Sequence, residues 1–316
     1  MRPGRNATLS STSVVFVALV GNILVAASKV GAALWTGSAA MASEAIHSIV
    51  DTSNEILLLY GIRRARRKPD PDHPLGYGRE IYFWSFVVSL LIFALGAGFS
   101  IYEGVARVLH PVPIRSPAVS YSVLALVFLF EGGSWLYSLR QFRQRKGDLS
   151  FFEAITLSKD PPSFMTLFED SVALLGVVIA AAATYAAVAL GHPEFDGLGS
   201  IAIGLILAGT SLFLARESKS LLIGEPAYPS VRQSILALAN AQPSCLKANG
   251  LITVQVGPNQ VLAMLSLEFS DDLKAPQIEE AVVSLETKVR AQNPEIIALF
   301  VKPQTPKTFH DQREFR

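Results

Sequence analysis

The chain has 316 residues, of which 50% are hydrophobic and 17% charged, and its mean hydropathy is +0.38. This composition is too apolar for a wholly soluble protein and too polar for one that lies entirely in a membrane, so we predict a membrane domain joined to a soluble domain. The net charge of +1, without basic residues interleaved with aromatics, gives no indication of a nucleic-acid site.

Six stretches are long and apolar enough to predict membrane-spanning helices. The first follows Arg2 and Arg5, but it is too long for a secretory signal peptide and leads to no cleavage site, so we interpret it as a retained span. We expect a six-helix domain over about residues 1–222, a soluble domain over 223–305 and a polar tail over 306–316. The six stretches are about residues 13–33, 39–60, 81–105, 117–138, 164–190 and 198–217.

Basic residues gather in two of the predicted loops. One group lies between the second and third spans and the other between the fourth and fifth, so the positive-inside rule places both loops and both termini in the cytoplasm. We expect the protein to lie in a cell (inner) membrane. The lone Cys245 excludes an internal disulfide and a cysteine-rich zinc site. The basic groups are Arg63, Arg64, Arg66, Arg67 and Lys68, and Arg140, Arg143, Arg145 and Lys146.

The second predicted span carries ionisable residues on one face. His47 and Asp51 stand four residues apart, and Glu44 and Glu55 extend the same stripe. An ionisable group at membrane depth costs roughly 2.5–3.5 kcal/mol on insertion scales, so such groups usually line a pathway or bind an ion. A buried ion pair is the structural alternative, and we favour a metal site.

The fifth predicted span carries a second polar cluster, Thr166, Glu169 and Asp170. Thr166 and Asp170 share a helix face, whereas Glu169 points about 100° away, so we expect Asp170 to join His47 and Asp51. Imidazole and carboxylate ligands favour zinc and also accept iron(II), manganese, cobalt and nickel. Because these ligands lose protons when they bind metal, the site predicts metal/proton antiport.

Two further ionisable residues interrupt apolar spans, and the cytoplasmic loop between the fourth and fifth spans is unusually long. Lys29 lies in the first span and Glu131 in the fourth, and we expect Lys29 to pair with an acid. Residues 151–155 in the long loop predict a short helix at the membrane interface.

Beyond Ala227 the pattern changes to that of a small α+β domain. It predicts a helix over about 229–241, strands over about 250–256 and 260–269, a helix over about 275–292 and a strand over about 295–302, which is the αββαβ order of a ferredoxin-like domain. Gly257 to Gln260 predict the turn of a hairpin. A domain of about 80 residues has a marginal core, so dimerisation would help to bury its sheet.

These features together resemble the cation diffusion facilitator family over nearly the whole chain. The resemblance rests on six spans, the HxxxD of His47 and Asp51, the acids of the fifth span, and the strings Thr36-Gly37-Ser38, Asp72-His73-Pro74-Leu75-Gly76-Tyr77-Gly78-Arg79 and Leu221-Leu222-Ile223-Gly224-Glu225. It implies a homodimeric metal efflux transporter whose ligands are His47, Asp51 and Asp170. Thr166 replaces the His or Asp of many members, so Glu169 or water would complete the shell. This combination is similar to the branch that contains the mitochondrial zinc exporter.

The resemblance also implies features outside the membrane site. Asp70 and His73 match a second metal site of some members, although Tyr77 stands where a His is common. Arg79 and Glu225 occupy the positions of an ion pair. In the soluble domain, Phe300-Val301-Lys302-Pro303 replaces a strand ending that carries a His in many relatives, so we predict a dimer scaffold without a metal cluster.

The leading hypothesis is therefore a homodimeric Zn²⁺/H⁺ antiporter, without a resident cofactor and without enzymatic activity. Transport of Fe²⁺, Mn²⁺, Co²⁺ or Ni²⁺ is an alternative because these ions accept the same ligands. A non-transporting regulatory partner subunit is a second alternative, since Thr166 is a poor metal ligand. A membrane metalloenzyme is a third, with Glu169 or Glu44 as the base beside a zinc-bound water.

Overall fold

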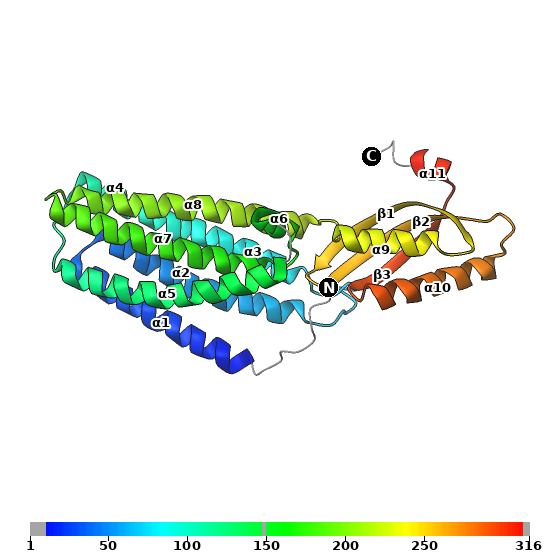
Figure 1. Ribbon diagram of the computed structural model, residues 1–316, viewed down its shortest axis with the longest axis horizontal. Helices are drawn as coiled ribbons and strands as arrows, with labels where there is room; N and C mark the ends of the chain where they lie inside the picture. Colours follow the sequence, from blue (N-terminus) through cyan, green and yellow to red (C-terminus); the bar gives the residue numbers. More distant parts are fainter. Residues whose placement is uncertain (1–10, 147–149, 312–316) are drawn as a thin grey trace. The chain divides into compact units, whose positions relative to one another are not determined.

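The computed structural model describes residues 11–146 and 150–311 (Figure 1). Its first part contains α1 (Ser11–Thr36), α2 (Ala39–Ala65), α3 (Glu80–Leu91), the π-helical segment η1 (Ile92–Ala97), α4 (Gly98–Leu109), α5 (Pro117–Lys146), α6 (Phe151–Leu157), α7 (Pro161–Ala189) and α8 (Glu194–Ile223). Its second part contains α9 (Pro229–Asn240), β1 (Cys245–Gly257), β2 (Gln260–Phe269), α10 (Ala275–Gln292), β3 (Ile296–Pro303) and α11 (Pro306–Asp311).

The chain divides into two compact units. The first contains the residues up to Tyr60, Trp84–Phe151 and Pro162–Arg216. The second contains Gly61–Phe83, Phe152–Pro161 and the residues from Glu217 onward. The domain limits expected near residues 222 and 305 stay predictions.

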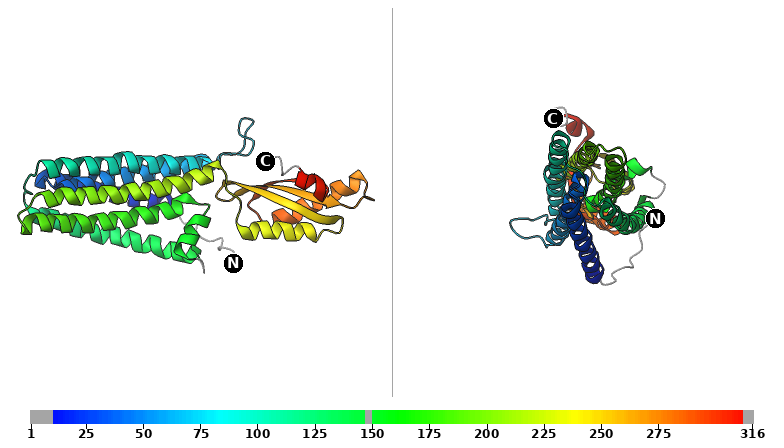
Figure 2. Two further views of the ribbon diagram at one scale, coloured as in Figure 1. Left: turned by 90° about the horizontal axis from the view of Figure 1, so that it is seen from above. Right: turned by 90° about the vertical axis from the view of Figure 1, so that its left-hand side faces the viewer.

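The first unit is a bundle of long helices, which Figure 2 (right) views nearly along their axes. Within the described residues, four helical segments are long and apolar enough to cross a membrane: Glu80–Leu109, Pro117–Gln144, Phe164–Ala189 and Glu194–Ile223. They correspond to the third to sixth predicted spans. The first two predicted spans fall on α1 and α2, and α2 is less apolar because it carries the ionisable stripe. The protein is a multi-pass membrane protein, and the full six-span topology stays a prediction.

Helices α4 and α8 touch through their backbones. A Cβ atom added to Gly104 would lie 2.7 Å from the carbonyl oxygen of Gly197, and one added to Gly197 would lie 2.7 Å from that of Gly104. Likewise, a Cβ atom added to Gly204 would lie 3.0 Å from the amide nitrogen of Ile101. Small residues let membrane helices approach this closely, so dispersion contacts hold the two helices together.

The start of α2 is anchored on α8. Gly37 adopts the left-handed φ of +66° that turns the chain from α1 into α2. The Ser38 hydroxyl donates a 2.6 Å hydrogen bond to the buried carboxylate of Asp196, which also accepts the backbone N–H of Ala39. A carboxylate at a helix N-terminus satisfies free amides and complements the helix dipole. The Thr36-Gly37-Ser38 string therefore fixes where the helix that carries His47 begins.

The second unit contains the predicted small α/β domain. Strands β1 and β2 form the expected antiparallel hairpin, and β2 pairs with β3 in parallel, giving the order β1-β2-β3. The expected start of β1 near residue 250 was wrong, because β1 begins at Cys245. Bulges near Lys247 and Gly250 interrupt the alternation of buried and exposed residues, which hid this part of the strand from pattern reading. The predicted short helix near residue 151 is present as α6.

One face of this sheet packs against α9 and α10. The core consists of buried apolar side chains from both helices and from alternate strand positions. On the opposite face, Phe309 of α11 lies against Gly250, where a Cβ atom would collide with its ring. Ile252, Met264 and Phe300 form a register row across the three strands and are exposed on that face. Core members include Val231, Ile235, Leu251, Val261, Ala263, Leu265, Leu285 and Val289.

Candidate metal-binding site

Helix α2 brings the imidazole of His47 and the carboxylate of Asp51 together inside the bundle. The His47 Nε2 atom lies 3.4 Å from Asp51 Oδ2, and the side chains are 1% and 24% exposed. Neither ring nitrogen of His47 has a hydrogen-bond partner among the described residues, and neither does Asp51 Oδ1. Buried polar atoms nearly always have partners, so these three atoms are suited to bind a ligand.

The two acids of α7 face different helices. Asp170 Oδ2 accepts hydrogen bonds from the hydroxyls of Ser134 at 3.3 Å and Ser138 at 2.8 Å, both on α5. The Glu169 carboxylate instead accepts a long 3.5 Å hydrogen bond from the amide of Asn54 on α2. We expected Asp170 to point toward His47 and Asp51 on α2, but its hydrogen bonds are with α5 instead. Both acids nevertheless lie within electrostatic reach of the Asp51 carboxylate.

Thr166 is exposed, and its hydroxyl donates a 3.2 Å hydrogen bond to the carbonyl oxygen of Pro162, one turn earlier in α7. This is the usual local bond of a threonine inside a helix. Among the described residues, no group of three or more His, Cys, Asp or Glu side chains is placed to hold a metal ion. The structure thus brings His47 and Asp51 together and leaves Glu169 and Asp170 of α7 within electrostatic reach of Asp51.

Helix α5 contributes two serines that the sequence analysis missed, Ser134 and Ser138, on the same helix as the Glu131 that it had noted. Glu131, Ser134 and Ser138 follow at spacings of three and four, so they share one helix face. The indole of Trp135 also donates a 2.9 Å hydrogen bond to the Ser171 hydroxyl, which ties α5 to α7. The spacing was visible in the sequence, but serines in membrane helices commonly bond to their own backbone and so give a weak signal.

The two ends of the α2 stripe are paired with α1. Lys29 Nζ lies 3.0 Å from Glu44 Oε2 and 2.8 Å from Glu131 Oε1, which confirms that Lys29 pairs with acids. At the other end, the amide of Asn22 donates a 2.9 Å hydrogen bond to Glu55 Oε2. The ends of the stripe are therefore paired with α1, whereas His47 and Asp51 at its centre keep atoms that have no hydrogen-bond partner among the described residues.

In the loop before α3, where the second metal site is predicted, Tyr77 contacts Asp70. The Tyr77 hydroxyl donates a 2.6 Å hydrogen bond to Asp70 Oδ2, and the backbone N–H of His73 donates one of 2.8 Å to Asp70 Oδ1. The bond from Tyr77 lowers the pKa of the Asp70 carboxyl and raises the pKa of the Tyr77 phenol. The guanidinium groups of Arg67 and Arg64 lie 4.7 Å and 5.6 Å from the centre of the Tyr77 ring. A cation bound at Asp70 would displace the phenol and face two positive charges.

The ion pair expected between Arg79 and Glu225 is replaced by another. Glu225 Oε2 lies 2.5 Å from Nζ of Lys159, in the loop before α7. The backbone of Lys159 is held as well, because its carbonyl accepts the Tyr82 hydroxyl and its N–H donates to the Tyr228 hydroxyl, both at 3.2 Å. The partner on this loop lies far from Glu225 in sequence, so spacing could not reveal it.

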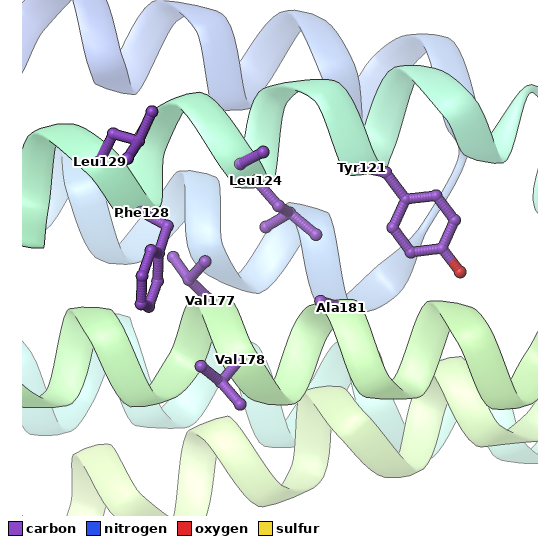
Figure 3. A pocket seen from close by; sticks show the side chains of 8 residues that line it. Tyr121, Leu124, Phe128, Leu129, Val177, Val178 and Ala181 are labelled. Carbon is purple, nitrogen blue, oxygen red and sulfur yellow. The ribbon is translucent and has the colours of Figure 1, made fainter.

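An apolar pocket of about 500 Å³ lies on α5 and α7, apart from these polar residues (Figure 3). No carboxylate or imidazole lines it. We therefore do not place the metal site in this pocket. Its lining residues are Tyr121, Leu124, Ala125, Phe128, Leu129, Val177, Val178 and Ala181.

Comparison with known proteins identifies the family of this chain. Residues 15–223 match the family model of the cation efflux transmembrane domain, a range that contains His47, Asp51 and both α7 acids. The chain is 36% identical over 258 residues to the human "Proton-coupled zinc antiporter SLC30A9, mitochondrial", covering 81% of this chain and 45% of that protein.

More distant relatives come from plants and bacteria. The chain is 34% identical over 217 residues to "Metal tolerance protein C4" of Arabidopsis thaliana, covering 68% of this chain and 47% of that protein. It is 24% identical over 285 residues to "Cation-efflux pump FieF" of Yersinia enterocolitica, covering 88% and 87%. The chain spans about half the length of the mitochondrial and plant relatives it matches. It belongs to the cation efflux family, also called the cation diffusion facilitators, whose members are membrane transporters and not enzymes.

Proposed function

We propose that this protein is a proton-coupled divalent-metal efflux transporter with zinc as its main substrate and the His47–Asp51 pair as the centre of its metal site. The observation that carries the proposal is the buried His47 imidazole, which lies beside a carboxylate and has no hydrogen-bond partner among the described residues. A buried imidazole with both nitrogens free is costly unless a ligand binds it for part of the cycle.

The remaining ligands come from α7. Asp170 reaches the pair if it leaves Ser134 and Ser138, and Glu169 reaches it if it leaves its long bond to Asn54. We propose Asp170 as the third ligand and Glu169, Thr166 or water as the fourth. A site of one imidazole and carboxylates suits tetrahedral zinc, and Fe²⁺, Mn²⁺, Co²⁺ and Ni²⁺ are secondary candidates.

Proton coupling follows from ligand chemistry. Metal binds the deprotonated carboxylates and neutral imidazole, so protons and metal compete for the same atoms. If the site opens to each side of the membrane in turn, metal leaves on the side where protons enter. The relatives named as proton-coupled zinc antiporters support this coupling.

The proposal includes a homodimer in an inner cell membrane, with both termini in the cytoplasm. The exposed apolar row of Ile252, Met264 and Phe300 supports a second copy of the chain as partner, because the small domain gains core area by covering it. Relatives named as mitochondrial make a mitochondrial membrane the alternative location. The basic loops would face the cytoplasm or the matrix in the same way.

The test is zinc flux into proteoliposomes under an imposed pH gradient, with the native protein and Asp51→Ala compared. We expect gradient-dependent flux from the native protein and none from the variant. Ser122→Ala, on the exposed face of α5, is the matched control for handling and reconstitution. Flux in Asp51→Ala equal to the native rate would contradict the proposed site.

A non-transporting regulatory subunit is the second candidate. It is favoured by Thr166, whose hydroxyl bonds to its own helix, and by the lack of an assembled three-ligand group among the described residues. No flux of zinc, iron(II) or manganese from a folded native dimer would favour this candidate over the transporter.

A further inference from the structure

A buried charged triad of Lys29, Glu44 and Glu131 ties α1, α2 and α5 together. The ammonium of Lys29 contacts Glu44 at 3.0 Å and Glu131 at 2.8 Å. The side chains of Lys29 and Glu44 are 0% exposed, and that of Glu131 is 17% exposed. Three charged groups from three helices thus meet inside the bundle.

The triad is not electrically balanced. One ammonium faces two carboxylates, and Glu44 Oε1 and Glu131 Oε2 have no hydrogen-bond partner among the described residues. Within the described part of the first unit, Lys29 is the only buried cation. A charge pair that served only to hold helices together would be costly in this setting, because desolvation offsets most of its attraction.

Helix α7 also reaches the triad. A Cβ atom on Gly176 would collide with Glu44 Oε1, so the glycine leaves the space that this carboxylate oxygen occupies. The four helices that carry polar residues of the candidate site therefore all converge on the triad. A shift of α7, which carries Glu169 and Asp170, would also move Gly176 relative to the Glu44 carboxylate.

The position of the triad along α2 defines a direction. Glu44 precedes Asp51 by seven residues, which is about 10 Å along a helix. It lies between the metal pair and the turn at Gly37, so an ion that leaves the pair toward that turn passes Glu44. There the Lys29 ammonium already occupies the place between two carboxylates that a cation would take.

We propose that the Lys29–Glu44–Glu131 triad is a tethered-cation plug, which closes the ion path on the side of the α1–α2 turn and opens when α1 or α5 moves. This inference rests on the proposed transport function. The fixed ammonium repels metal ions and excludes water from the closed path, and its withdrawal exposes the two carboxylates as a transient binding station for the departing ion.

The test measures proton leak without any metal. The full-length protein is reconstituted into liposomes that contain a pH-sensitive dye, and the decay of an imposed pH gradient is followed. We expect Lys29→Met to speed the decay several-fold over the native protein, whereas Lys29→Arg, which keeps the cation, stays close to native. Arg107→Gln is the matched control, since Arg107 pairs at 3.4 Å with Glu103 within α4, outside the triad.

A second variant separates loss of the proposed plug from simple misfolding of Lys29→Met. Lys29→Met combined with Glu44→Gln and Glu131→Gln removes every charge of the triad, so no carboxylate is left without a counter-charge. We expect this triple variant to fold and to leak as well. Native-like gradient decay in both variants would overturn the plug, as would failure of both to fold, which would give the triad a purely structural role. Because the leak assay contains no metal, its result is separate from zinc flux, whose absence would contradict the transporter itself.

Discussion

Two histidine–aspartate pairs in this chain have the same separation between nitrogen and oxygen but different surroundings. In α2, His47 and Asp51 lie 3.4 Å apart, and in the loop before α3, His73 and Asp70 also lie 3.4 Å apart. In the first pair the His47 imidazole is buried, and its nitrogens have no hydrogen-bond partner among the described residues. In the second pair the His73 side chain is exposed, and both oxygens of Asp70 accept hydrogen bonds. The same two residue types therefore lie in a helix in one place and in a loop turn in the other, and what differs is which of their atoms have hydrogen-bond partners among the described residues. We have proposed the first pair, and not the second, as the metal site.

The strongest test of this comparison exchanges each histidine for glutamine. We expect His47→Gln to lower zinc affinity by at least about 100-fold, because even the outer partners of metal ligands contribute 10–100-fold. His73→Gln should leave zinc binding close to native. Isothermal titration of the purified protein in detergent measures both. Equal losses in the two variants would mean that burial does not separate the pairs.

The next largest effect distinguishes the two acids of α7. We expect Asp170→Asn to reduce zinc affinity more than Glu169→Gln does, by about tenfold or more, since loss of a direct ligand exceeds loss of an outer partner. The same titration measures this. A larger loss in Glu169→Gln would assign the third ligand to the acid that already faces α2.

A smaller effect is expected where α2 begins. Asp196→Asn keeps the shape of the side chain but removes the charge that faces the first amides of α2. We expect a loss of about 1 kcal/mol of stability, as for other helix caps, with a parallel decrease in zinc affinity. Thermal unfolding in detergent measures the first quantity, with Glu194→Gln, in the same turn of α8, as control. Unchanged stability would show that the Ser38 hydroxyl alone anchors the helix.

The smallest effect concerns the loop pair. Tyr77→Phe removes the hydroxyl that lowers the Asp70 pKa, so this pKa should rise toward its ordinary value. A lowered carboxyl pKa stabilises the fold above that pKa, and the contribution is lost as pH falls through it. The variant should therefore lose the part of this pH dependence that comes from Tyr77 and keep the part that comes from His73. Carboxyl NMR titration measures it, and Asp272 is the internal control, because its own low pKa comes from Ser270. An unchanged Asp70 pKa would show that the His73 backbone dominates.

The parts of the site that sequence could predict are those set by local geometry. His47 and Asp51 share a face because any helix places residues four apart together. Which acid of α7 faces α2 depends on the rotation of α7, and its partners Asn54, Ser134 and Ser138 lie on other helices, far away in the sequence. The same reason explains why the small domain could be predicted element by element, whereas the Lys159 partner of Glu225 could not.

The close backbone contact between α4 and α8 has a consequence for measurements of helix movement during the transport cycle. Two helices whose backbones approach this closely at Gly104 and Gly197, with Val108 and Ile201 packed against the glycines, have little room to slide past each other. Spin labels or fluorophores placed on these two helices should report one unchanging separation. The distance between these labels would serve as a constant reference for measuring movement of α1, α5 and α7.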